Sequence, residues 1–236
     1  HVPLPVPPNY IRRFAAQATR ERWAPTRTNY TAMTSFVDET VGNITTAWRM
    51  KVGEQGWAQT LVIFHGDNGG DECGSNNFPL RGNKFTNWCA LQVTERLSKS
   101  PDPSECGAMT CCLREGGTRV AAFVAGGYLP THARGGRRES GLIHVVDWYT
   151  TILTLAGIQE PQRDDRAAAA GLPPPDSLDV WPLISGTNST SPRTGFVMSA
   201  NGLKHLQNIT NGQALIDWPY KLLTGHQQTA TWSSEI

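Results

Sequence analysis

The sequence predicts an α/β fold, and three stretches carry that prediction. From Thr28 to Lys51, apolar residues recur at spacings of three and four, as on one face of an amphipathic helix: Met33, Val37, Val41, Ile44 and Trp48. Leu61 to Phe64 and Val120 to Ala125 are short apolar runs typical of strands that are covered on both faces. A helix, a short loop and a buried strand in this order are characteristic of α/β proteins.

Composition sets limits on the function. The chain has 236 residues, of which 39% are hydrophobic and 17% charged, as expected of a globular protein. Its formal charge of +1 gives no reason to expect a nucleic-acid partner. No apolar run approaches the ~20 residues of a transmembrane helix. Because the chain opens at His1 with neither an initiating Met nor a signal peptide, we expect it to be a portion of a longer protein.

The N-terminal third is predicted to be extended first and helical afterwards. Prolines keep His1 to Pro8 extended and unable to begin a helix. Gly53 and Gly56 are expected to end the helix and turn the chain into the first strand. Asp38 and Glu39 fall in mid-helix, where we expect solvated side chains, although paired acids also suit general acid/base catalysis.

The end of the first strand carries the best candidate for a binding site. Asp67 and Asn68 place a carboxylate beside an amide carbonyl, and Gly69 and Gly70 allow a sharp turn. Oxygen ligands of this kind suit a hard divalent cation, and ligands of open α/β sheets gather beyond the carboxyl ends of strands. The alternative is an ordinary surface turn.

The C-terminal half is predicted to hold a further helix and a small sheet. An apolar stripe from Leu142 to Ala156 predicts a helix that Gly157 ends. In this stretch His144 and Asp147 could form a catalytic pair, but we expect hydrogen bonders that anchor the helix. Residues 163–175 are charged, then rich in Ala and Pro, as in an exposed linker. Phe196 to Ala200 and Ala214 to Gly225 are expected to form strands.

Cysteines and sequons bear on the compartment. Cys89, Cys106, Cys111 and Cys112 could bind zinc, but their spacings match no paired Cys-x-x-Cys site. Asn-x-Ser/Thr sequons occur at Asn29, Asn43, Asn188 and Asn208 and favour glycosylation in the secretory pathway, with a lysosomal or extracellular destination.

Several strings resemble the type I sulfatases, and the arylsulfatase B group in particular. They are Gly66–Gly70 (GDNGG), Asn76–Lys84 (NNFPLRGNK), His1–Pro8, Leu142–Trp148, Asp176–Leu183 and Asp217–Gly225. The resemblance implies an alkaline-phosphatase-like sulfatase fold, with a partial central mixed sheet flanked by helices and a small C-terminal sheet. Residues 1–185 would be a partial catalytic domain, with an atypical insertion at 89–114, and residues 186–236 a C-terminal subdomain.

The resemblance also implies roles for single residues. Asp67 and Asn68 would bind calcium, Lys84 would bind the sulfate group, and His1 would contact the sulfate or protonate the leaving oxygen. Glu115 would stabilise a loop. The activity would be hydrolysis of a sulfate ester on an aryl compound or a glycan.

The chain departs from the family in one respect that matters for catalysis. No cysteine begins the Cys-x-Pro/Ser-x-Arg motif from which the formylglycine nucleophile is made, so we expect that motif upstream and expect the chain alone to be inactive. Two alternatives stay open: a non-catalytic truncated homologue, and a metal-dependent phosphatase or phosphodiesterase of the same superfamily. The sequence does not indicate an oligomeric state.

Overall fold

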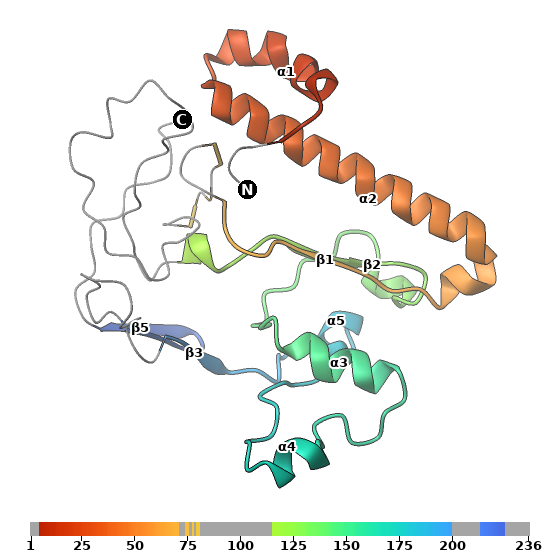
Figure 1. Ribbon diagram of the computed structural model, residues 1–236. Helices are drawn as coiled ribbons and strands as arrows, with labels where there is room; N and C mark the ends of the chain where they lie inside the picture. Colours follow the sequence, from red (N-terminus) through yellow and green to blue (C-terminus); the bar gives the residue numbers. More distant parts are fainter. Residues whose placement is uncertain are drawn as a thin grey trace.

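The computed structural model describes residues 5–70, 74–75, 77, 79–80, 115–199 and 213–224 (Figure 1). It is a mixed α/β structure, as predicted. The helices are α1 (Pro8–Glu21), α2 (Pro25–Ala58), α3 (Asp147–Leu155), α4 (Asp165–Ala169) and α5 (Trp181–Ser185), with short 3₁₀ turns η2 (Glu115–Gly117) and η3 (Thr131–Ala133). The strands are β1 (Val62–His65), β2 (Ala122–Ala125), β3 (Gly195–Ser199), β4 (Gln213–Asp217) and β5 (Tyr220–Thr224).

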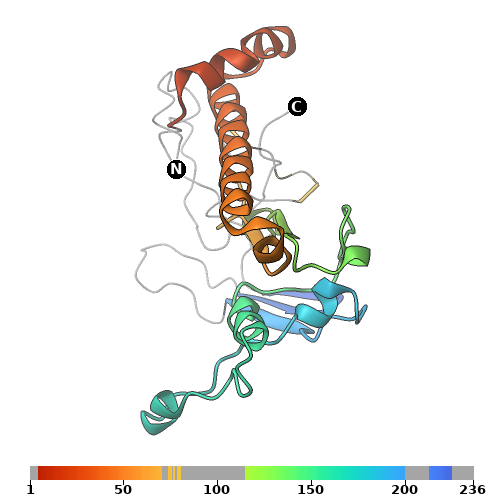
Figure 2. The ribbon, with the colours of Figure 1, turned by 90° about the vertical axis from the view of Figure 1, so that its right-hand side faces the viewer.

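The elements lie in three groups along the molecule. Figures 1 and 2 show α1 and the start of α2 at one end, the β1–β2 pair beside the far end of α2, and α3, α4 and α5 at the opposite end. No helix in the described part of the chain is long and apolar enough to cross a membrane.

Helices α1 and α2 form an antiparallel pair. Each starts with a proline, whose fixed φ and missing N–H suit the first helical position. Tyr10 is buried between them and meets Phe36 edge-on at 5.1 Å. The sequence did not predict α1, and the prediction that no helix begins before residue 9 is wrong, because Pro8 is its first residue.

The predicted long helix is confirmed, but its end is not. The helix α2 continues past Gly53, which adopts φ 67° and ψ −177° and so forms a kink, and ends at Ala58. A glycine can absorb this left-handed conformation without a Cβ clash, which allows helical hydrogen bonding to resume beyond it. The final turn is tied to the next segment, because Trp48 Nε1 donates to Thr60 Oγ1 at 3.0 Å.

The two predicted core strands are strands, but they are not covered on both faces. They pair antiparallel, with Val62 opposite Ala125, and Phe64 stacks on Phe123 at 5.0 Å. Phe123 is nevertheless 46% exposed. Within the described residues no further strand joins this pair. The apolar stripe of α2 is open as well, with Ile44 63% and Trp48 44% exposed.

The predicted C-terminal sheet is confirmed as the antiparallel order β3–β4–β5. One face packs inward, where Phe196 meets the His144 ring at 4.6 Å and Ala214 is buried. The helix predicted from Leu142 begins only at Asp147, since residues 142–146 form a loop and turn, and Gly157 follows its end with φ 86°. The predicted linker is exposed, although it includes the short helix α4.

A buried polar cluster holds α3 to the segment before β3. Asp147 is 0% and Arg193 4% exposed, and they form a close ion pair with a shortest N–O distance of 2.7 Å. Ser177 Oγ accepts from the Thr150 N–H at 2.9 Å and donates to the Val146 carbonyl at 2.7 Å. Buried charges and hydroxyls need such partners, because an unpaired one is expensive in an apolar interior.

Candidate functional site

The segment that follows β1, Gly66–Gly70, is the glycine loop, and backbone contacts fix its position. The Gly66 N–H donates to the Ala121 carbonyl at 3.1 Å, and the Gly69 N–H donates to the Gly117 carbonyl at 2.9 Å. A Cβ on Gly69 would lie 1.7 Å from the Gly116 carbonyl oxygen. Only glycine lets the two backbones approach this closely. The loop is therefore clamped onto the turn that leads into β2.

A second set of contacts holds the far side of the loop. The side-chain amide of Asn77 accepts from the Gly70 N–H at 2.9 Å and donates to the Gly70 carbonyl at 3.0 Å. Gly74 packs so closely on the first turn of α2 that a Cβ there would be 2.8 Å from the Thr26 carbonyl oxygen. The sequence analysis quoted Asn77 only as part of a motif and missed this clamping role, which depends on a partner seven residues away.

Asp67 and Asn68 lie just beyond the carboxyl end of β1, as predicted. Asp67 is exposed, and its Oδ1 accepts from the Asn68 N–H at 2.9 Å. The Asn68 amide group donates through Nδ2 to the Gly69 carbonyl at 2.9 Å. Among the described residues, Asp67 Oδ2 and Asn68 Oδ1 accept no hydrogen bond, so two oxygens remain for a ligand.

These two oxygens match part of what a calcium ion needs. Carboxylate and amide oxygens are the ligands that Ca²⁺ takes, but it takes about six to eight of them. No group of three or more His, Cys, Asp or Glu side chains that could hold a metal occurs in the parts of the chain described. Asp67 and Asn68 thus fit as contributors to such a site and do not complete it.

Other predicted site residues cannot be placed beside them. His1, Lys84 and Asn208 lie outside the described residues, as do the four cysteines considered for zinc. The convergence of His1 and Lys84 with Asp67 on one pocket therefore stays a prediction. Of the other sequon residues, Asn43 and Asn188 are exposed and Asn29 is half-buried.

The structure decides between the two interpretations of His144 and Asp147 in favour of anchoring. The Asp147 carboxylate accepts from the backbone N–H groups of His144 at 2.8 Å and Leu178 at 3.0 Å, besides pairing with Arg193. The Val146 N–H donates to His144 Nδ1 at 3.3 Å. Together these bonds resemble a capping box, with His144 as the cap and Asp147 three residues later.

Burial and the nearby Arg193 guanidinium lower the pKa of His144 below its usual value, which favours the neutral imidazole that accepts this bond. Arg193 was missed by the sequence analysis, because an isolated arginine 46 residues from its partner leaves no local pattern.

Asp38 and Glu39 are exposed on α2, and Glu39 pairs with Arg13 at 2.9 Å. This pairing confirms the prediction of solvated side chains. Glu115 begins η2, but its side chain lies outside what the structure describes.

Comparison with known proteins connects this geometry to a function. The chain is similar to arylsulfatase J of Mus musculus, with 28% identity over 98% of this chain and 33% of that protein. It is also similar to a sulfatase of Formosa agariphila, with 28% identity over 58% of this chain and 20% of that protein. The chain thus spans a third or less of the length of these relatives. No family model and no solved structure matches it.

Proposed function

We propose, from the relationship of this chain to sulfatases, that it forms the C-terminal portion of a sulfuric ester hydrolase. The observation that carries the proposal is that the similarity to arylsulfatase J extends over 98% of the chain. The glycine loop supports it, because a carboxylate and an amide oxygen stand free at the end of β1. In this proposal the fold is the alkaline-phosphatase-like fold of the sulfatases, and the substrate is a sulfated small molecule or glycan.

The residues of this chain would divide the work at the site. Asp67 and Asn68 would hold the calcium ion, which when bound neutralises negative charge on the sulfate oxygens. Lys84 would hold a sulfate oxygen, and His1 would donate a proton to the leaving oxygen. The formylglycine nucleophile would come from an upstream part of the protein. The clamped glycine loop would keep the two calcium ligands in one orientation, which reduces reorganisation during the reaction.

A comparison of three proteins on a chromogenic aryl sulfate tests the proposal. They are this chain, a full-length form containing Cys-x-Pro-x-Arg, and the same full-length form without residues 89–114. We expect no turnover by this chain, because the nucleophile is absent and the loss of one member of a catalytic unit removes most of the rate. Turnover by this chain, or faster hydrolysis of the matching aryl phosphate by the full-length forms, would contradict the proposal.

Substitution then assigns the site. In an active full-length form, Lys84→Ala should lower kcat/KM by about 10²–10³-fold if Lys84 holds developing charge. Asp67→Asn should raise the calcium concentration needed for half-maximal activity. Lys51→Ala, at an exposed position on α2, is the matched control and should leave both quantities unchanged. An unchanged kcat/KM in Lys84→Ala would remove Lys84 from the site.

The sequons favour passage through the secretory pathway as part of the same proposal. Asn43 and Asn188 are exposed, so both are sterically open to glycosylation. Protein secreted from animal cells should lose mass on treatment with a glycosidase that removes N-linked glycans. An unchanged mass would contradict this localisation.

A further inference from the structure

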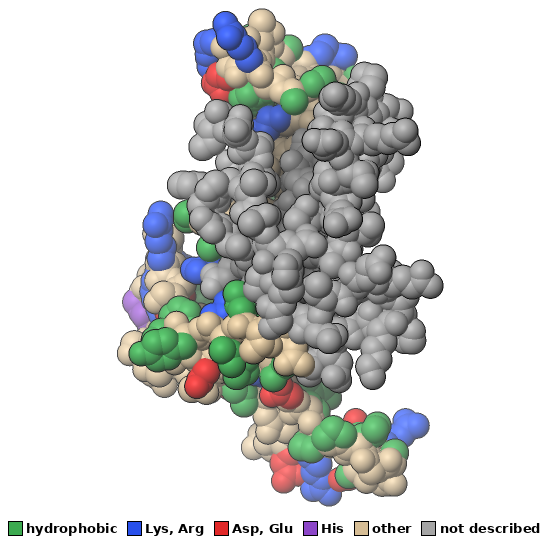
Figure 3. Space-filling view, turned by 90° about the vertical axis from the view of Figure 1, so that its left-hand side faces the viewer, with side chains coloured by type: hydrophobic (Ala, Val, Ile, Leu, Met, Phe, Trp, Pro, Cys, Tyr) green, Lys and Arg blue, Asp and Glu red, His purple; other side chains and the backbone are tan. Residues whose placement is uncertain are grey.

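A basic region lies away from the glycine loop, at the turn between α1 and α2. We define this basic end as residues 9–28. It contains five arginines (Arg12, Arg13, Arg20, Arg22 and Arg27) and one acidic residue, Glu21. Since the whole chain has 21 basic and 20 acidic residues, the basic end carries +4 and the remainder −3. Figure 3 shows Lys and Arg side chains gathered at this end of the molecule.

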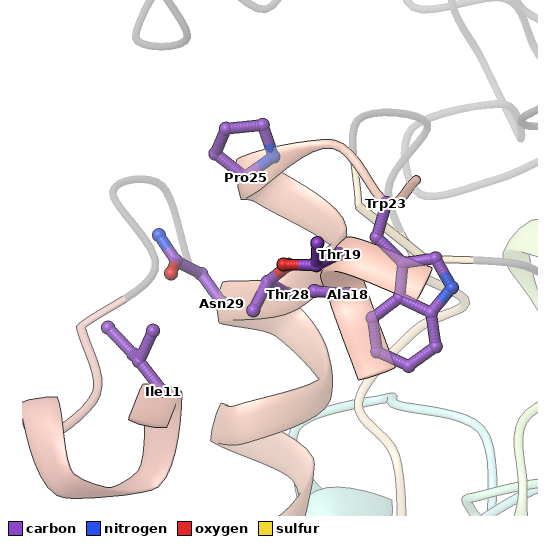
Figure 4. Close-up of a pocket in the computed structure, with 7 residues that line it drawn as sticks. All are labelled: Ile11, Ala18, Thr19, Trp23, Pro25, Thr28 and Asn29. Carbon is purple, nitrogen blue, oxygen red and sulfur yellow. The ribbon is translucent and has the colours of Figure 1, made fainter. Parts of the chain in front are cut away.

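A hollow of about 320 Å³ opens between the two helices of the basic end (Figure 4). Its lining combines the Trp23 indole and the Ile11 side chain with hydroxyl and amide groups from Thr19, Thr28 and Asn29. An aromatic face beside several hydrogen-bonding groups suits a sugar ring, which has both apolar C–H faces and hydroxyls. The Asn29 side chain forms no hydrogen bond within the described residues and is therefore available to a ligand.

Arginines surround this hollow. Four lining residues are each next in sequence to an arginine: Ile11 to Arg12, Thr19 to Arg20, Trp23 to Arg22 and Thr28 to Arg27. Adjacent helical residues point about 100° apart, so arginines beside lining residues on the helices belong at the rim rather than inside. The Arg27 guanidinium also lies over the Trp23 ring, 5.5 Å from its centroid.

Arg22 has a conformation that points to a function. It ends α1 in the left-handed region, with φ 55° and ψ 42°, and it is the one non-glycine residue with positive φ in the described chain. Glycine is preferred at this position, so an arginine there is held at some expense of stability. Arg13 and Arg20 pair with Glu39 and Glu21, whereas the Arg22 side chain has no partner among the described residues.

We propose that the basic end binds a sulfated saccharide chain, with one sugar ring in the hollow against Trp23 and sulfate groups on Arg12, Arg22 and Arg27. The planar guanidinium fork matches sulfate oxygens as it does those of phosphate and carboxylate. The inference rests on the proposed sulfatase function and narrows its substrate class from any sulfate ester to a polymeric sulfated glycan. Because Thr26 contacts the segment after the glycine loop and Thr28 lines the hollow, the same turns of α2 connect the two places.

The same observations disfavour two other polyanions. An anionic membrane would need an apolar face to insert, but α1 already buries Tyr10 against Phe36. A nucleic acid would be expected to need a larger basic surface than one patch on a chain of net charge +1.

Calorimetry on the 236-residue chain tests the proposal. The probe is a heparin decasaccharide, and a hyaluronan oligosaccharide of the same length, which carries carboxylates but no sulfate, is its control. We expect binding of the first and at least about tenfold weaker binding of the second, because charge-assisted bonds to sulfate are missing. Binding to the sulfated probe should weaken steeply with salt.

Substitutions at Arg22 give the sharpest result. Arg22→Gly should raise the thermal midpoint of unfolding, because glycine fits the left-handed conformation, and should weaken heparin binding by about tenfold. Arg22→Gln removes the charge without that relief and should weaken binding equally. The matched control is Arg166→Gln, at an exposed arginine of α4 without an ion pair in the described part of the chain, and it should leave affinity unchanged.

Several outcomes would overturn the proposal: no binding of heparin, equal binding of hyaluronan, or equal losses in Arg22→Gln and Arg166→Gln. Tighter binding of phosphatidylserine vesicles or single-stranded DNA, with the same dependence on Arg22, would replace it with one of those partners. Failure of the sulfatase proposal is seen separately, as absent turnover of a small aryl sulfate by the full-length form. Arg22→Gly should not alter that turnover.

Discussion

The two ends of this molecule are stabilised in different ways. Before the glycine loop, Tyr10 and Ala32 are the buried apolar side chains that the structure describes, and the stripe on α2 is largely exposed. Around α3 and α5, Val180 and Leu183 are fully buried beside the Asp147–Arg193 ion pair. The loop with the candidate calcium ligands is therefore positioned by close contacts between backbones, whereas the opposite end depends on buried side chains and their hydrogen bonds.

The largest effect should come from the buried ion pair. Arg193→Met leaves the Asp147 carboxylate buried without its charged partner, and we expect it to lower the free energy of unfolding by about 3–5 kcal/mol. Arg163→Met is the matched control, because Arg163 pairs with Glu160 and Asp165 in full solvent exposure. The control should change stability by no more than about 0.5 kcal/mol. Urea unfolding followed by tryptophan fluorescence measures both, and similar losses would remove the contrast between the two ends.

A smaller effect is expected at the backbone contacts of the glycine loop. Gly69→Ala forces a Cβ against the Gly116 carbonyl, so the loop or η2 must shift, with a loss of about 1–3 kcal/mol. Gly42→Ala is the control, because nothing lies within 4 Å of a Cβ at Gly42 in mid-helix α2. It should stabilise the protein by about 0.5–1 kcal/mol. Opposite signs in the same urea assay would support the contrast, and a neutral Gly69→Ala would show that the loop is not clamped.

The smallest effect concerns the pH dependence of the opposite end. The pKa of His144 is lower in the folded protein than its usual value, mainly through burial and then through Arg193, although Asp147 and Asp176 act in the opposite direction. The unfolded chain therefore binds more protons just below pH 6.5, so stability should fall as the pH drops from about 6.5 through the folded pKa. Protonation of Nδ1 would also remove the acceptor for the Val146 N–H.

His144→Asn keeps a capping group but does not titrate, so its unfolding free energy should change less over this pH range than that of the wild type. His65→Asn, at an exposed histidine after β1, should retain the wild-type dependence. Equal slopes in all three proteins would show that His144 does not couple folding to pH.

The sequence predicted elements whose signals are local. The 3.6-residue period of α2, the apolar runs of β1 and β2 and the C-terminal hairpin are all confirmed, because each pattern lies within one continuous stretch. The position of Asp67 and Asn68 after β1 was likewise predictable, since it follows from their order in the chain.

Features that depend on distant partners could not be predicted. Arg193 finds Asp147 across 46 residues, and Asn77 closes on a backbone group of Gly70 rather than on a side chain. The kink at Gly53 was mistaken for a helix end, because a glycine with positive φ occurs in both. Alternation and apolarity predicted burial of β1 and β2, yet burial depends on what packs against a strand, and the described residues supply little.

The length of α2 limits how the segment after it can vary. From Thr26 to Val52 the helix rises about 39 Å at 1.5 Å per residue, and the chain must return over that distance, because Gly74 packs on Thr26 while Thr60 is tied to the final turn. The fourteen residue steps from Thr60 to Gly74 reach at most about 50 Å, which leaves a margin of about three residues. Deleting one residue removes about 3.5 Å of reach, whereas shortening the helix by one residue removes only 1.5 Å of distance. Homologues with a shorter return segment should therefore have α2 shorter by about two residues for each one lost, and those with a longer return segment need no such compensation.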